Sequence, residues 1–190
     1  MKLKYSDKVQ KVEDLNTKIK ETEKSNREKD EVIGDLSDIF NNILEEFEFP
    51  KLSNAFIDVN KYLPHVRNRQ YDELGSLGAV TLITTAYYLS ILLLGTTKEY
   101  NHLGLLIIDS PQSNLGASSN EDDDLFKDEK IYQSVVRYLV SLSEEYEDEF
   151  QILVVNNGYP NFLDSKYIIK EFDGNGTREL PYGLIDDIKS

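Results

Sequence analysis

Asp109 is the residue best placed to do chemistry, because it ends an apolar, partly β-branched run that begins at Leu103. A run of this kind predicts a strand buried on both faces, as in a parallel sheet. Pro111 then stops the strand, since proline has no amide hydrogen to give to a ladder. An acid at the carboxyl end of such a strand can hold a hydrated Mg²⁺ beside a nucleotide phosphate. The alternative is a plain core strand with an acidic end.

The segment that follows strengthens the first interpretation. Residues 109–116 resemble the D-E-P-x-x-N-L-D motif of ABC-type ATPase heads, and are closest to the coiled-coil branch of SMC proteins, RecN and SbcC. Asp109 then ends a Walker B strand. The residues that match the motif are Asp109, Pro111, Asn114 and Leu115. The residues that depart from it are Ser110, at the position of the catalytic Glu, and Gly116, at the position of the D-loop Asp.

The resemblance implies roles for these residues. Asp109 would ligate Mg²⁺ through water, and Ser113 and Asn114 would bind ATP from a D-loop that crosses a dimer interface. Because Ser110 replaces the Glu that polarises the attacking water, we expect slow hydrolysis. Gln112 would then orient the water, as a neutral Gln does in certain GTPases.

Two further segments resemble motifs of the same heads. The Gly-Ser-x-Gly segment 75–78 opens an apolar helix, where backbone amides and a hydroxyl can bind an anion, although Gly and Ser are also ordinary N-cap residues. By resemblance to the L-S-G-G-E/Q signature, Ser76 and Gly78 would grip the γ-phosphate of ATP held by the opposite subunit. Residues 151–155 resemble the switch strand, with Asn157 at the position of its His.

The chain contains no G-x-x-x-x-G-K-[ST] motif, so it has no P-loop to cradle a phosphate. The order of its motifs resembles the C-terminal lobe of an ABC/SMC-type P-loop NTPase head. This lobe is an α/β fold with a largely parallel sheet flanked by helices. The resemblance implies ATP and Mg²⁺ as cofactors and an N-terminal Walker A lobe as partner, in the same native chain or in a separate subunit. It also implies a homodimer around sandwiched ATP, and DNA as a target of the intact assembly.

Residues 1–47 predict one long helix with a seven-residue repeat of apolar or neutral side chains. The repeat consists of Val12, Leu15, Ile19 and Thr22, then Ile33, Leu36, Phe40, Ile43 and Phe47, with Asn26 and Lys29 on the same stripe. We interpret the helix as the root of a coiled-coil arm that needs a partner helix, with Gly34 as a kink or as the point where arm becomes head. The head would occupy residues 48–190. The alternative is a surface helix packed on its own domain.

The remaining segments predict further elements. Residues 55–63 predict a strand that Pro64 interrupts, paired as an edge hairpin with residues 66–71. Arg67 and Arg69 in that hairpin either contact DNA or a nucleotide, or are solvated edge charges. The other predicted elements are a solvated loop over 117–128, an amphipathic helix over 129–146, a buried strand over 151–155, a strand over 166–172 and a turn over 173–176.

Composition limits the classes of function. The 190 residues carry a formal net charge of −14, which argues against a broad nucleic-acid footprint but leaves room for a local basic patch. There is no Cys, and His65 and His102 are the only histidines, so we expect neither disulfides nor a zinc site. Met1–Tyr5 lacks the apolar region of a signal peptide, and Ala79–Gly95 predicts a core helix rather than a membrane span. We expect a cytoplasmic protein without a membrane partner. The alternative function is that of a non-catalytic coiled-coil adaptor with an α/β head.

Overall fold

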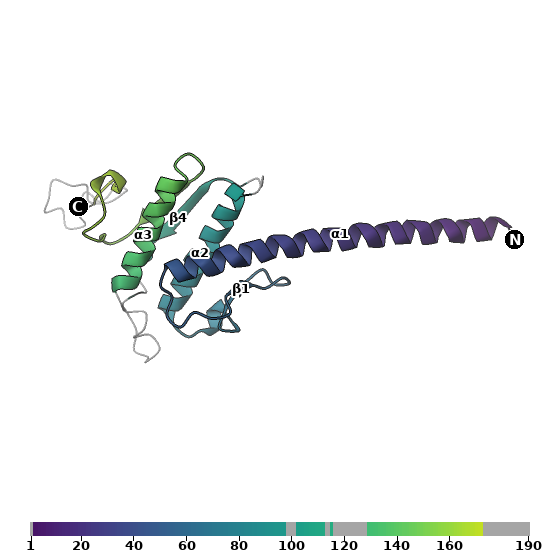
Figure 1. Cartoon of the computed structure of the whole chain (residues 1–190), viewed down its shortest axis with the longest axis horizontal. Coiled ribbons are helices and arrows are strands. Elements are labelled where there is room, and N and C mark those ends of the chain that lie inside the picture. Colours follow the sequence, from purple (N-terminus) through teal and green to yellow (C-terminus); the bar gives the residue numbers. More distant parts are fainter. Residues whose placement is uncertain (1, 98–101, 113–114, 116–128, 173–190) are drawn as a thin grey trace, which may run out of the picture. The chain divides into compact units, whose positions relative to one another are not determined.

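The computed structural model of the chain describes residues 2–97, 102–112, 115 and 129–172 (Figure 1). Within them, three α-helices are combined with a small parallel sheet and a small antiparallel sheet, which agrees with the predicted α/β class. The chain divides into two compact units, Met1–Asn157 and Gly158–Ser190. All of the described residues that were predicted to do chemistry lie in the first unit.

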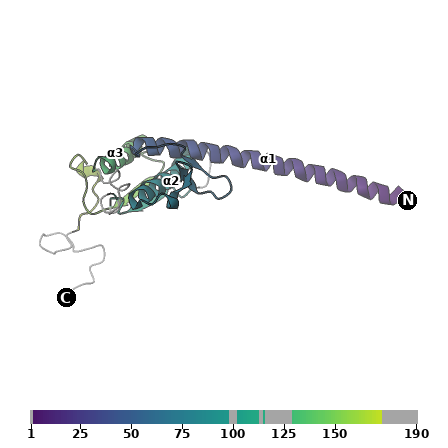
Figure 2. The same cartoon turned by 90° about the horizontal axis from the view of Figure 1, so that it is seen from below.

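The long helix α1 (Lys2–Glu46) has the predicted extent and continues through Gly34. Its C-terminal half packs on α2 and on β1, and both views place it across α2 (Figures 1 and 2). Repeat positions from Gly34's neighbour onward are buried there: Ile33, Leu36, Phe40, Ile43 and Phe47. The helix ends where Glu48 adopts a φ of 53°, and the amide of Phe49 donates to the Leu44 carbonyl at 3.0 Å. This bond satisfies a carbonyl that the helix end would otherwise leave open.

A small antiparallel sheet follows α1, with β1 (Phe56–Ile57), β2 (Pro64–Val66) and β3 (Arg69–Gln70) in that order. The prediction of one strand over 55–63 was therefore wrong. Only two of its residues pair, because Asp58 accepts the amides of Asn60 and Lys61 and turns the chain. Pro64 begins β2 instead of interrupting a strand, as the first position of a strand allows. The predicted hairpin is present.

The apolar helix α2 (Leu77–Thr97) follows a short 3₁₀ helix, η1 (Tyr71–Glu73). It is long and apolar enough to cross a membrane, and 56% of its most apolar stretch is buried inside the first unit. It packs against α1, β2 and β4. Its buried side chains include Leu82, Ile83, Ala86, Leu89 and Leu92. The helix forms the core of this unit because nearly every face of it meets another element.

Two parallel strands carry the predicted site. β4 (Leu105–Asp109) pairs with β5 (Gln151–Val155), and α3 (Glu129–Glu145) lies between them in the chain. Five residue pairs form the ladder, from Leu105 opposite Gln151 to Asp109 opposite Val155. Just before β4, Gly104 has a φ of 68°, and its carbonyl accepts the Gln151 amide at 2.7 Å. α2 packs on β4 and α3 packs on β5.

The prediction that these strands are buried on both faces was wrong. Ile108 is buried, whereas Ile107 is 60% exposed and Leu105 is 37% exposed. Successive side chains of a strand point to opposite faces, so the described elements cover one face of β4 and leave the other open. β5 is likewise half-buried or exposed along its length. The sheet is parallel, but two strands with helices on one face are less than the expected layered sheet.

In the second unit, the structure describes residues 158–172. The predicted strand over 166–172 was wrong. The chain instead forms a 3₁₀ helix, η3 (Ser165–Tyr167), which Asp164 caps by accepting the Lys166 amide at 2.9 Å. Residues 168–172 are not in a strand. The predicted loop over 117–128 and the predicted turn over 173–176 lie outside the described residues.

Candidate functional site

Asp109 lies at the carboxyl end of β4 with its side chain exposed. The Ser110 hydroxyl donates to the Asp109 carboxylate at 2.9 Å, and the Ser110 amide donates to the Val155 carbonyl at 2.7 Å. Ser110 has a φ of 50°, a left-handed conformation that few non-glycine residues adopt. The turn away from the sheet therefore begins immediately after the acid, and Ser110 orients that acid by a direct hydrogen bond.

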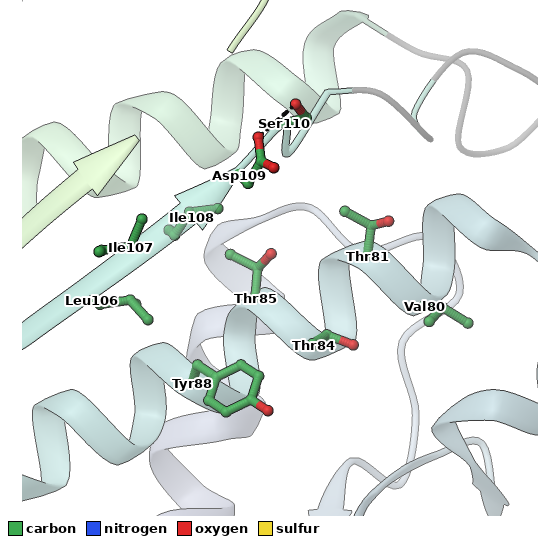
Figure 3. Close-up of a pocket in the computed structure, with 10 residues that line it drawn as sticks. All are labelled: Val80, Thr81, Thr84, Thr85, Tyr88, Leu106, Ile107, Ile108, Asp109 and Ser110. Atoms are coloured by element: carbon green, nitrogen blue, oxygen red, sulfur yellow. Dashed lines mark hydrogen bonds between the residues drawn. The ribbon is translucent and has the colours of Figure 1, made fainter. Parts of the chain in front are cut away.

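A groove of about 320 Å³ lies between the end of β4 and the first turns of α2 (Figure 3). Asp109 and Ser110 lie at one side of it, and Thr81 and Thr85 face them from α2. Its other lining residues are Val80, Thr84, Tyr88, Leu106, Ile107 and Ile108. Hydroxyl groups and a single carboxylate suit a hydrated cation, because water can bridge the cation to oxygen atoms that do not contact it directly.

A second polar cluster joins β4, α3 and β5. The Asn156 amide nitrogen donates to the Gln112 side-chain oxygen at 3.0 Å and to the Tyr132 hydroxyl at 2.8 Å. Burial raises the pKa of Tyr132, and the hydrogen bond from Asn156 lowers it in part. The cluster fixes the position of Gln112 relative to the end of β5. Sequence analysis missed Asn156 and Tyr132, although the paired Asn residues after the strand were a signal. The predicted residue, Asn157, is exposed.

Ser76 and Gly78 lie at the start of α2, and both are buried. The Ser76 hydroxyl accepts the Ala79 amide at 3.4 Å, so it acts as the N-cap of the helix. Between them, Leu77 is 59% exposed. Ser76 precedes Thr81 by five residues, which is about 7 Å along a helix axis. The start of α2 is thus close to the groove, while the binding of a phosphate by Ser76 and Gly78 stays a prediction.

The D-loop residues Ser113 and Asn114 lie outside the described residues, as does Gly116. Leu115 is buried, and its amide donates to the Gln112 carbonyl at 3.0 Å. The chain therefore turns after Pro111, as the sequence predicts. Of the candidate site residues, the structure brings Asp109 and Ser110 together at the groove.

The arginine pair of the hairpin separates into two environments. Arg67 donates to the Pro50 carbonyl and, at 3.0 Å, to the Lys51 carbonyl, and its guanidinium lies over the Phe49 ring. It therefore holds the segment after α1 in place. Arg69 is exposed, which matches the alternative of a solvated edge charge.

Metal binding rests on Asp109 alone. In the part of the chain that the structure describes, no three His, Asp or Glu side chains gather where they could hold a metal ion. A single carboxylate fits a cation that keeps most of its water, as Mg²⁺ does. It does not fit a dehydrated cation held by protein ligands only. No protein-family model matches the chain, and no curated protein matches it.

Proposed function

We propose that this chain is the C-terminal half of an ATP-binding head of the SMC/RecN type, part of a cytoplasmic assembly that dimerises around ATP and acts on DNA. The observation that carries the proposal is the groove in which Asp109, at the end of a parallel strand, faces the first turns of α2. The carboxyl end of a parallel strand is where ligands bind in α/β sheets. The intact assembly would serve DNA repair, chromosome organisation or defence against phage.

The proposal divides the site between two lobes. Asp109 holds a hydrated Mg²⁺, and the Ser110 hydroxyl orients its carboxylate. The missing P-loop comes from an N-terminal Walker A lobe, which also covers the open face of β4 at Ile107. That lobe supplies the backbone amides and the Lys that bind the phosphates. This chain alone therefore binds ATP weakly and does not hydrolyse it.

The residues around Asp109 take part in the second half of the reaction. Gln112, positioned by Asn156, orients the attacking water, and Asn157 faces the γ-phosphate with an amide that cannot carry a proton. In a dimer, Ser76 and Gly78 contact the γ-phosphate from the opposite subunit, together with Ser113 and Asn114. With Ser110 in place of a Glu, no strong base acts on the water, so hydrolysis is slow.

The test is ATP hydrolysis by this chain joined to or mixed with a lobe that carries the P-loop. We expect turnover below about 1 s⁻¹ and a loss of at least about 10-fold in Asp109→Ala, because second-shell partners of a metal typically contribute that much. Glu147→Ala, which removes an exposed carboxylate of the same unit, is the matched control. Equal activity of Asp109→Ala and the control would reject the proposed site, and a fast wild type would reject slow hydrolysis.

The second candidate function is that of a non-catalytic coiled-coil adaptor. The exposed stripe on the N-terminal half of α1 favours it, as does the absence of a three-ligand metal group among the described residues. A P-loop encoded upstream of Met1 would favour the ATPase. If no P-loop lobe confers Mg²⁺-dependent ATP binding on the chain, the adaptor is the better description.

A further inference from the structure

The N-terminal half of α1 exposes a row of large apolar side chains. Val12, Leu15 and Ile19 are 56%, 51% and 53% exposed. They occupy alternating first and fourth positions of a seven-residue repeat that continues without interruption into the buried half of the helix at Ile33 and Leu36. Such a repeat is the pattern by which one helix packs along another. The same stripe is therefore covered at one end of α1 and open at the other.

We propose that a second copy of this chain covers the open stripe, with the two α1 helices parallel and in register over residues 12–29. This inference does not rest on the proposed nucleotide chemistry. It rests on how the side chains of the stripe match their own copies.

The layers of the stripe favour a parallel pair. In register, Val12, Leu15 and Ile19 each meet the same apolar residue of the second copy. Asn26, at a first position of the repeat, then meets Asn26, and a single Asn at this position fixes the register of two-stranded parallel coiled coils. An antiparallel pair centred on the stripe would place Val12 against Lys29 and Leu15 against Asn26. Only the parallel pair keeps apolar layers apolar.

The residues that flank the stripe agree with this direction. In a parallel pair, each residue at the seventh position of one repeat lies beside the residue five positions later in the other copy. Lys18 then faces Glu23 of the second copy, which is an attractive pair. Lys11 faces Asn16, and Ser25 faces Asp30, so none of these positions brings like charges together.

The end of the pairing is set by the first unit itself. The Lys29 ammonium lies 4.8 Å from the centre of the Tyr62 ring, a cation–π contact that directs it toward its own chain. One turn later, Ile33 is buried on its own chain. The stripe open to a second copy therefore spans residues 12–29, which is short for a coiled coil, so the pairing depends on protein concentration.

Cysteine substitution gives a sharp test, because the chain has no Cys of its own. Leu15→Cys and Asn26→Cys place a thiol in the proposed seam, and Thr17→Cys and Lys24→Cys place one on the opposite, exposed face. After oxidation with copper–phenanthroline, each seam variant is expected to form a disulfide with its own copy, at least about 10-fold more than the outer-face variants. An antiparallel pair would instead cross-link a mixture of the two seam variants and neither of them alone, which would overturn the proposal.

Sedimentation of the chain without ATP provides a second measurement. Mass should rise from monomer toward dimer with concentration. Leu15→Lys should abolish the rise, because it places like charges in the seam at a position exposed in the single chain, while Thr17→Lys should retain it. A wild-type chain that stays monomeric up to about 1 mM, where even a weak pairing would populate the dimer, would overturn the proposal. Neither measurement depends on the fate of the ATPase proposal.

Discussion

The two halves of α1 share one repeat but differ in what covers it. Phe40 and Ile43 are fully buried against the first unit, whereas Leu15 and Ile19, at equivalent positions, are about half exposed. The covered half uses larger side chains and is bounded by the loop that Arg67 holds. A seven-residue repeat thus states that a helix needs a neighbour, while the size and polarity of the residues on it state how completely that neighbour covers it.

The largest effect should come from emptying the covered half. Phe40→Ala removes a fully buried ring and should lower the free energy of unfolding by about 3–5 kcal/mol. Leu15→Ala, in the open half, should change it by less than about 0.5 kcal/mol in dilute solution. Urea unfolding followed by circular dichroism measures both. Similar losses for the two variants would show that the halves do not differ as described.

A smaller effect should come from the loop that closes the covered half. Arg67→Ala removes the guanidinium that donates to two backbone carbonyls, those of Pro50 and Lys51. We expect a loss of about 1–3 kcal/mol in unfolding free energy, since those carbonyls lose their donor. The exposed Arg69 provides the control, and Arg69→Ala should stay within about 0.5 kcal/mol of wild type. An equal cost for both arginines would contradict the structural role of Arg67.

The smallest effect concerns pH. Tyr138 packs edge-on against Phe47 with ring centres 5.9 Å apart, and burial, followed by the Glu46 charge, raises its pKa to about 12. An unfolded Tyr has a pKa of about 10. Between these values the unfolded chain has lost a proton that the folded chain keeps, so stability falls as pH rises.

Tyr138→Phe should therefore weaken the fall in stability across this alkaline range, as measured by thermal unfolding at a series of pH values. Tyr88→Phe, at a ring that is 51% exposed, should leave the profile as in wild type. A profile that responds equally to both substitutions would contradict the assignment to Tyr138.

The helices could be predicted from the sequence because their signals are local. The repeat of α1 and the amphipathic pattern of α3 extend over many turns, and both helices lie where predicted. The strands were harder. The apolar run of β4 predicts burial on both faces, but Ile107 is exposed in the described chain. Composition reports the surroundings that a strand favours, and the residues of one chain need not supply them.

The candidate site shows the same limit. Asp109 and the turn at Pro111 could be predicted, because an acid and a proline after an apolar run form a local pattern. Asn156 could not be assigned, because its contacts with Tyr132 and Gln112 join residues 24 and 44 positions away in the chain. Such contacts depend on where α3 returns the chain to the sheet, which no short motif encodes.

The open face of the two-stranded sheet has a consequence for the handling of this protein. It combines exposed branched residues such as Ile107 and Val155 with strand edges that carry unpaired backbone groups in the described sheet. Surfaces of this type promote aggregation by adding strands from other molecules. The net charge of −14 opposes such contacts by repulsion between copies. Added salt, which screens that repulsion, should therefore precipitate the isolated chain sooner than dilution would.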